Sequence, residues 1–382
     1  MIKSLEIKNF KAIERAKVKL TPLTAFIGYN GTGKSSMLEA LETFQAIVAS
    51  GLDKAMQPWR LFEHVHYKGK KKHRRFSKNE IAFKYAPMEF SFDVKLDTKA
   101  PLNPLRFSSS IAEDKGNNGR IYFIEEKVKY KQFERSRDAD NHYITQGKQA
   151  AWDYPDQSIL IAEPETRKYV ESWQFLSMNT FLMGNPFPQK KTGGKITLNK
   201  DGSNLAEYVL SVRDASPDVF RGIIETIQYI LPYASDIQPA ITQELENRVY
   251  MLLSEQDFKL PGWLLSTGTL KVLALLSVFR NPNPAPLIAI EEIENGLDPR
   301  TINLIINEIR EFVKDKKSQV IITTHSPYLL DLLHLSQVVF VERKDGNVVF
   351  NRPYDFEQLR TWSKDYTPGE MYRKDLIQQI IK

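Results

Sequence analysis

The stretch TAFIGYNGTGKSSMLEAL, residues 24–41, places small, flexible residues and one lysine between two apolar segments. Its residues 28–35 fit the pattern G-x-x-x-x-G-K-[ST]. Glycines in this pattern let the backbone curl until successive N–H groups point at phosphate oxygens, and the positive end of the next helix adds to the attraction. A glycine-rich turn without a ligand is the alternative, but the apolar strand before the loop and the amphipathic helix after it favour a phosphate site.

The loop predicts a nucleoside triphosphate as its ligand. Lys34 is expected to reach the β- and γ-phosphates, and Ser35 is expected to bind Mg²⁺. Such a site also needs an acid that binds the metal and a residue that orients water. Acids at the ends of other buried strands are therefore the candidates for these roles.

The segment PLIAIEEIENGLDP, residues 286–299, places two acids directly after an apolar strand. Glu291 is expected to bind the metal and Glu292 to orient the attacking water, although adjacent acids also occur as plain surface charge. His325 ends the next predicted strand, one strand–helix–strand distance further on. Both strand ends can then lie at one sheet edge, where His325 could contact the γ-phosphate or the attacking water.

A second anion-binding helix end is predicted in LLSTGTLKVLALL, residues 264–276. Ser266 is expected to cap a strongly apolar helix, with Gly268 beside it. Because the glycine-rich loop already serves the chain's own nucleotide, a second phosphate-seeking terminus indicates a partner chain.

The order of elements predicts an α/β fold. Buried strands alternate with helices in the last third, which indicates a parallel sheet covered on both faces, whereas residues 80–132 have the pattern of antiparallel strands. We expect a mainly parallel sheet flanked by helices, an N-terminal antiparallel β subdomain and an inserted α-rich lobe. The expected segments are 1–132, 133–254, 255–350 and 351–382, the last being a tail.

The net charge of +6 comes from one place. Residues 68–78, KGKKKHRRFSK, hold seven Lys and Arg and no acid, and the rest is nearly neutral. The stripe is either a solvated loop or a contact for a nucleic-acid backbone, since clustered cations release counterions from DNA. The candidate DNA contacts are Lys68, Lys70, Lys71, Lys72, Arg74 and Arg75.

Several classes are excluded by composition. The chain contains no cysteine, which excludes disulfides, thiolate–zinc sites and cysteine nucleophiles. No apolar run is long enough to span a membrane, and the N-terminus lacks the apolar core of a secretory signal, so a cytoplasmic protein without a membrane partner is expected.

In this order the motifs resemble the ATPase heads of the ABC class, specifically the group with RecF, the SMC proteins and the OLD-family ATPases. LLSTGTLKVLALL resembles the signature motif, IAIEE the Walker B strand, NGLD the D-loop and IITTHSP the switch histidine. The resemblance implies a P-loop NTPase fold and a homodimer, or a higher oligomer, whose heads enclose two ATP molecules with Mg²⁺. No long coiled coil separates the halves.

The resemblance also assigns roles residue by residue. Glu292 would be the catalytic base, His325 the switch, and Ser35 with Glu291 the metal site. The trans contacts with the partner's ATP would come from Ser266, Gly268, Thr269 and Asp298. The contacts with the chain's own ATP would come from Gly28, Asn30, Gly31, Thr32, Gly33, Lys34, Ser35 and Ser36.

Two departures from the family pattern bear on function. Position 291 is Glu where Asp is usual, which Mg²⁺ tolerates by binding through water. The signature reads S-T-G-T, which argues against a transporter subunit. Too few residues follow His325 for the nuclease domain that OLD proteins append. The expected function is an ATP-dependent switch that senses DNA or a partner and gates a separate nuclease or toxin, plausibly in antiphage defence. The alternatives are a RecF-like DNA clamp or repair mediator and, less favoured, a self-contained nuclease.

Overall fold

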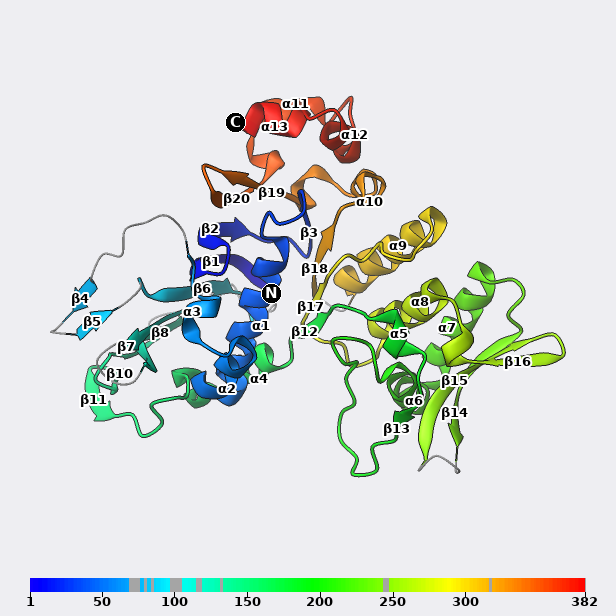
Figure 1. The fold of residues 1–382 in the computed structure, drawn as a ribbon, viewed down its shortest axis with the longest axis horizontal. Coiled ribbons are helices and arrows are strands. Elements are labelled where there is room, and N and C mark those ends of the chain that lie inside the picture. The colour runs from blue at the N-terminus through cyan, green and yellow to red at the C-terminus, as the bar shows by residue number, and fades with distance from the viewer. Residues whose placement is uncertain are drawn as a thin grey trace. The chain divides into compact units, whose positions relative to one another are not determined.

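The computed structural model describes residues 1–68, 76–78, 81–83, 86–96, 105–114, 119–130, 133–242, 247–315 and 318–381. These residues form two compact units (Figure 1). Unit 1 comprises Met1–Trp173 and His334–Lys382, and unit 2 comprises Gln174–Leu333. Of the basic stripe, Lys70, Lys71, Lys72, Arg74 and Arg75 lie outside the described residues, so their role stays a prediction.

The largest sheet lies in unit 1 and is antiparallel throughout. Its strands follow the order β11-β10-β9-β8-β7-β6-β1-β2, with β5 pairing β7 and β4 pairing β5. Alternate residues of β6 are buried, as expected for a sheet with one face on the core. The strands are β1 Ile2–Phe10, β2 Ile13–Lys19, β4 Phe76–Lys78, β5 Ile81–Phe83, β6 Met88–Val94, β7 Leu105–Asp114, β8 Arg120–Tyr130, β9 Phe133–Arg137, β10 His142–Thr145 and β11 Lys148–Ala151.

A shorter set of strands in unit 1 supports the glycine loop. The fully buried β3, Leu23–Ile27, pairs in parallel with β19, Val338–Lys344, and β20, Asn347–Asn351, returns antiparallel along β19. The turn between β19 and β20 has positive φ angles at both Asp345 and Gly346, a combination typical of a tight β-hairpin.

Helix α1, Lys34–Ser50, follows the loop and buries its apolar side against the large sheet. The ring of Phe44 lies 4.6 Å from that of Phe92 and 5.2 Å from that of Phe107 between centroids. The helix ends before Gly51, whose φ of 84° is readily adopted only by glycine. The other helical segments of unit 1 are α2 Leu52–Met56, η1 Gln57–Trp59, α3 Phe62–Val65, η2 Ile159–Ala162, α4 Pro164–Glu171, η4 Leu335–Gln337, η5 Pro353–Asp355, α11 Glu357–Trp362, α12 Pro368–Arg373 and α13 Leu376–Ile381.

Unit 2 is built on three parallel strands in the order β12-β17-β18. Phe175 of β12 pairs with Ala289 of β17, which pairs with Ile321 of β18. The strands are β12 Gln174–Leu176, β17 Leu287–Ile290 and β18 Gln319–Thr324. The helices are α5 Thr180–Met183, α6 Leu205–Ala215, α7 Pro217–Ile230, η3 Gly262–Leu264, α8 Thr267–Arg280, α9 Pro299–Asp315 and α10 Pro327–Asp331.

A second, antiparallel sheet accompanies these helices in unit 2. Strand β15 lies in its middle, with β14 along one edge and β13 and β16 on the other. The strands are β13 Phe187–Pro188, β14 Asp236–Thr242, β15 Arg248–Glu255 and β16 Phe258–Pro261. The expected α-rich lobe therefore contains a sheet as well as helices.

The α/β class is confirmed, but the expectation of a mainly parallel sheet is not. Consecutive strands between residues 88 and 151 pair as antiparallel neighbours, so the largest sheet is antiparallel. Parallel pairing is found at β3–β19 and at β12–β17–β18. The four predicted segment boundaries stay a prediction. None of the helices in the described ranges is long and apolar enough to cross a membrane.

Candidate nucleotide site

The glycine loop has the backbone shape that the sequence predicts. Gly31 and Gly33 have φ angles of 72° and 100°, a region that residues with a Cβ rarely adopt. A Cβ on Gly28 would lie 2.0 Å from the carbonyl oxygen of Val341, so this glycine permits the close approach of β19. Gly33 is also the N-terminal cap of α1, which puts the positive helix end at the loop.

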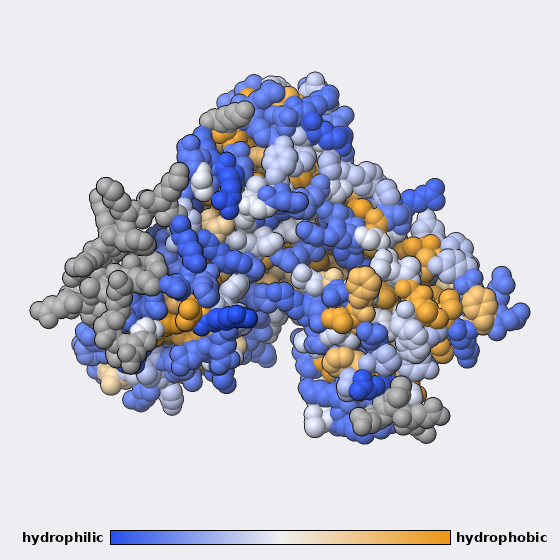
Figure 2. Space-filling view, in the orientation of Figure 1, coloured by the Kyte–Doolittle hydropathy of each residue, from blue (hydrophilic) through white to orange (hydrophobic). Residues whose placement is uncertain are grey.

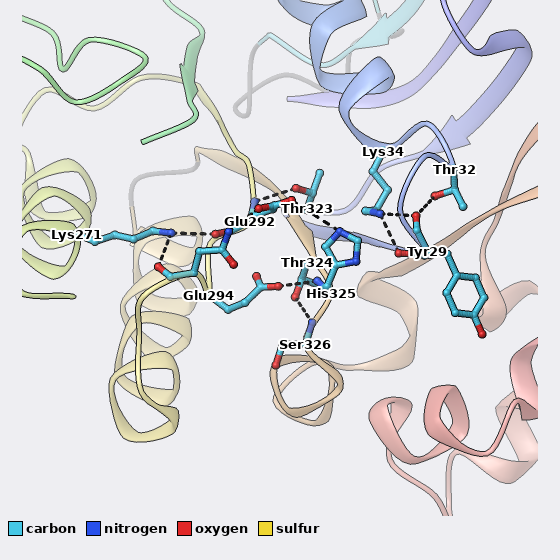
Figure 3. A network of polar contacts seen from close by, with 12 residues as sticks. Tyr29, Thr32, Lys34, Lys271, Glu292, Glu294, Thr323, Thr324, His325 and Ser326 are labelled. Carbon is cyan, nitrogen blue, oxygen red and sulfur yellow. Dashed lines mark hydrogen bonds and ion pairs between the residues drawn. The ribbon is translucent and has the colours of Figure 1, made fainter. Parts of the chain in front are cut away.

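Lys34 is buried, and its ammonium group lies within the loop. Its Nζ donates hydrogen bonds to the carbonyl oxygens of Gly28 at 2.8 Å and Tyr29 at 2.9 Å (Figure 3). The hydroxyl of Thr32 donates to the same Tyr29 carbonyl at 2.8 Å. These bonds place a positive charge beside the loop backbone, where a phosphate group would gain most from it.

The hydroxyl groups at the start of α1 differ in exposure. Ser35 is exposed and therefore accessible to a metal ion, whereas Ser36 is buried. Asn30 is exposed at the turn of the loop. The residues present therefore suit a magnesium–phosphate ligand at this point.

Sequence reasoning missed two neighbours of the loop. Arg343 of β19 donates from Nε to the carbonyl oxygen of Gly31 at 2.9 Å. Tyr29, with 59% of its surface exposed, lies 6.4 Å from Tyr372 of α12 between ring centroids. Both contacts join segments that are distant in sequence, and nothing local in the sequence points to them.

The two predicted acids of unit 2 follow β17 directly. The amide of Glu291 donates to the carbonyl oxygen of Leu176 at 2.8 Å, which extends the pairing with β12 by one residue. Glu292 is exposed and has a φ of 44°. Its amide donates to the Thr323 hydroxyl at 2.9 Å, and its carboxylate accepts from Asn295 Nδ2 at 2.5 Å.

His325 lies beside Glu292, as the strand order predicts. Its Nε2 is 3.8 Å from Glu292 Oε1 (Figure 3). Side chains hold the loop around it by accepting hydrogen bonds from backbone amides. The His325 amide donates to Glu294 Oε1 at 2.6 Å, and the Ser326 amide donates to the Thr324 hydroxyl at 3.0 Å. The proximity of acid and histidine follows from the adjacent parallel strands β17 and β18, whereas their catalytic roles stay a prediction.

The predicted cap of α8 is confirmed. Ser266 Oγ accepts a hydrogen bond from the amide of Thr269 at 3.1 Å. A Cβ on Gly268 would lie 2.7 Å from the carbonyl oxygen of Gly296, so this glycine lets the helix start approach the segment after Glu292.

Asp298 caps the neighbouring helix α9, and its carboxylate accepts the amides of Arg300 at 2.9 Å and Thr301 at 3.2 Å. The Thr301 hydroxyl, which also donates to Asp298, holds the pKa of that carboxyl below its usual value.

These two helix ends line one cavity of unit 2. Its volume is about 280 Å³, and its walls include Ser266–Thr269 and Gly296–Asp298 on the polar side. Ile227, Ile230 and Leu231 of α7 form the apolar side. Figure 2 shows apolar side chains at the surface of this unit near α7 and α8, and Tyr229, Trp263 and Leu264 are more than half exposed.

Fold and site define a P-loop ATPase head of the type found in SMC and OLD-like proteins. The model of a family described as "AAA ATPase domain" matches residues 1–254, and the chain belongs to this family. A second model, described as "AAA domain, putative AbiEii toxin, Type IV TA system", matches residues 179–331. The protein is therefore an ATPase.

Two curated relatives resemble the chain over most of its length. The ATP/GTP phosphatase of Helicobacter pylori is 23% identical over an alignment of 393 positions, which covers 94% of this chain and 97% of the relative. The OLD nuclease of Thermus scotoductus is 23% identical over 377 residues, which cover 91% of this chain and 63% of the nuclease. The chain thus spans less than two thirds of that nuclease.

Solved SMC heads share the fold. One, bound to the C-winged helix domain of ScpA, has a TM-score of 0.58 and 16% identity, covering 92% of this chain and 97% of the head. Another, with an extended coiled coil and derived from Pyrococcus furiosus, has a TM-score of 0.54 and 16% identity, covering 95% of this chain and 99% of the head.

Proposed function

We propose that the protein is an ATP-dependent switch that hydrolyses ATP with Glu292 as general base and that gates a separate effector. The observation that supports the catalytic part best is the 3.8 Å approach of His325 Nε2 to Glu292 Oε1 at the ends of adjacent parallel strands. The motif order assigns the phosphates to Lys34 and the metal to Ser35 and Glu291. When bound, Mg²⁺ would neutralise charge on the transferred phosphoryl group.

In the proposed reaction, side chains of the protein accept a proton, orient the attacking water and bind the phosphates. Glu292 accepts a proton from water as the water oxygen attacks the γ-phosphorus, and ADP leaves with the bridging oxygen. His325, within reach of the same carboxylate, orients the water or contacts the γ-phosphate. Lys34 offers a positive charge to the β- and γ-phosphates, while the amides of the glycine loop receive their oxygens.

We further propose that two copies of the chain share their sites. The support is the pairing of two capped helix ends, those of α8 and α9, at one cavity with apolar walls. The start of α8, capped by the neutral Ser266 hydroxyl, presents a positive helix dipole that suits the γ-phosphate of a nucleotide held by another copy. Ser266, Gly268, Thr269 and Asp298 are the proposed contacts with that nucleotide.

The shared-site proposal predicts rescue between two inactive variants. Ser266→Arg should bind ATP but fail to hydrolyse it, because the larger side chain fills the helix end. Lys34→Ala should lose turnover through weak phosphate binding. If pairs form at random, half of them are mixed and each mixed pair holds one complete site of two, so an equimolar mixture should regain about a quarter of the unchanged turnover per chain. Steady-state phosphate release measures this, and a mixture as inactive as its components would contradict sharing.

The effector is proposed to be a nuclease or a toxin encoded separately, and antiphage defence is the proposed setting. The match of residues 179–331 to the "putative AbiEii toxin, Type IV TA system" model supports this setting. DNA is the proposed trigger, on the strength of the basic stripe at residues 68–78. A RecF-like clamp, in which ATP controls only loading on DNA, is the alternative that the same stripe supports.

ATP hydrolysis with linear duplex DNA titrated in tests the proposed trigger. We expect stimulation at low salt that falls steeply at moderate salt, because phosphate contacts by the stripe release counterions. DNA binding should be lost when Lys70, Lys71, Lys72, Arg74 and Arg75 are neutralised. Any residual DNA binding should depend less on the salt concentration. Tight DNA binding without stimulation would favour the clamp. Unchanged hydrolysis without DNA binding would instead make the trigger a protein, to be sought among partners of the Glu292→Gln variant.

A further inference from the structure

A buried lysine connects helix α8 with the segment that carries Glu292. Lys271 is only 4% exposed, and its Nζ donates to the carbonyl oxygens of Glu292 at 2.9 Å and Asn295 at 3.0 Å (Figure 3). Burying an ammonium group is unfavourable unless its hydrogen bonds are made within the protein. The two carbonyl oxygens therefore compensate the buried ammonium group, and the lysine in turn satisfies both of them with strong hydrogen bonds.

The backbone at Glu292 needs such support. Its φ of 44° lies in the left-handed region, which is unfavourable for a residue with a Cβ and persists only where the surroundings enforce it. Three groups hold the residue in place: the Thr323 hydroxyl at its amide, Lys271 at its carbonyl and Asn295 at its carboxylate. Together they fix where the carboxylate points.

Lys271 has a matching acid nearby. Burial lowers the pKa of Lys271 to about 8, and the negative charges of Glu294 and Glu292 oppose this shift. Glu294 also accepts the amide of His325 at 2.6 Å through Oε1, while its buried Oε2 finds no hydrogen-bond partner among the described residues. The charge of Glu294 thus stabilises the Lys271 ammonium group, and its carboxylate accepts a hydrogen bond from the backbone amide of His325.

The same helix face carries the proposed contact with the second nucleotide. Gly268 lies one turn before Lys271 on α8 and approaches the Gly296 carbonyl oxygen so closely that a Cβ there would lie 2.7 Å from it. Positions three apart on a helix share a face. Gly268 and Lys271 therefore both lie against the turn formed by residues 292–296.

We propose that Lys271 is a positioning residue that holds the backbone of Glu292 in its left-handed conformation and so couples the start of α8 to the proposed base. The proposal rests on the proposed function, because it takes Glu292 to be the residue that activates water. Asn295 completes the arrangement by holding the carboxylate itself. Neither residue is proposed to touch ATP.

The test compares Lys271→Met, Lys271→Arg and the unchanged chain by kcat and KM for ATP. In Lys271→Met we expect kcat to fall about 10- to 100-fold, because a base displaced by about 1 Å loses that much. The KM should stay within about threefold, since nucleotide binding is left intact. Lys271→Arg should regain most of the kcat, because its guanidinium offers several donors to both carbonyls.

Two further variants separate positioning from folding. Ser277→Ala removes another fully buried polar group of α8 and should keep the unchanged kcat. If Lys271→Met does not fold, Asn295→Ala serves as the deciding variant. Asn295 is exposed, and the substitution removes the side chain that donates to the Glu292 carboxylate. Its kcat should fall about tenfold with unchanged KM.

An unchanged kcat in a folded Lys271→Met, or in Asn295→Ala where Lys271→Met does not fold, would overturn the proposal. An equal loss in Lys271→Met and Lys271→Arg would also overturn it, since hydrogen bonding to the carbonyls would then not be what matters. Glu292→Gln serves as the reference. If Glu292→Gln is inactive while Lys271→Met is fully active, only this inference fails, whereas a fully active Glu292→Gln contradicts the proposed function itself.

Discussion

Replacing Glu292 by Gln is expected to lower ATP hydrolysis about 10²- to 10⁴-fold while ATP binding is retained, because general-base catalysis contributes a factor of this size. Glutamine has the same shape and keeps an oxygen that can accept from Asn295 Nδ2, which is 2.5 Å from the carboxylate. It cannot take a proton from water. The change therefore removes the proposed chemistry and leaves the hydrogen bonds that shape the site.

The measurement is steady-state phosphate release at saturating ATP, together with binding of a fluorescent ATP analogue. Glu311→Gln is the matched control, since Glu311 is an exposed acid of the same unit and pairs with Lys314 at 3.6 Å on α9. It should hydrolyse ATP at the unchanged rate. Hydrolysis by Glu292→Gln at the rate of this control would remove Glu292 from the proposed role.

Much of the candidate site could be predicted because its determinants are local or follow from strand order. The glycine loop needs φ angles that glycine adopts, and Gly31 and Gly33 have them. The cap at Ser266 depends on one side chain and an amide three residues later. Glu292 and His325 each follow a buried strand, and adjacent parallel strands end at the same edge of a sheet.

The remainder depends on contacts between distant segments. In sequence, Lys271 is one polar residue in an apolar helix, which is typical of an exposed position, yet it is buried against carbonyls more than 20 residues away. The contact of Arg343 with the loop at Gly31 joins residues 312 positions apart. The extent of the antiparallel sheet also escaped prediction, because hairpin partners add strands one after another without any single strong motif.

The same limit applies to a buried ion pair in unit 1 that reads as surface charge in the sequence. Glu126 of β8 and Arg137 of β9 have fully buried side chains, with Nη2 and Oε2 2.6 Å apart. Glu126 also accepts the Ser158 hydroxyl at 2.7 Å and the Ile159 amide at 3.0 Å. The Arg137 guanidinium lies 4.1 Å from the centroid of the Phe123 ring. The pair thus joins two strands of the large sheet to η2.

Glu126→Gln is expected to lower the midpoint of thermal unfolding of unit 1 by on the order of 10 °C. Breaking a buried pair from one side costs about 3–5 kcal/mol, because the remaining charge is left buried without a partner, and each kcal/mol corresponds to roughly 2–4 °C for a unit of this size. Differential scanning calorimetry checks this. Lys129 and Glu134 form the matched control on the same two strands, with both side chains about half exposed and 3.3 Å between the charged atoms.

Glu134→Gln should shift the midpoint by no more than about 3 °C, since exposed pairs contribute only 0–1 kcal/mol. Replacing both buried partners, Glu126→Leu with Arg137→Met, should recover most of the loss, because apolar side chains of similar volume need no counter-charge. A double variant as unstable as Glu126→Gln would show that the hydrogen bonds to Ser158 and Ile159, rather than charge balance, hold this part of the sheet. A Glu126→Gln midpoint equal to that of Glu134→Gln would contradict the burial of the pair itself.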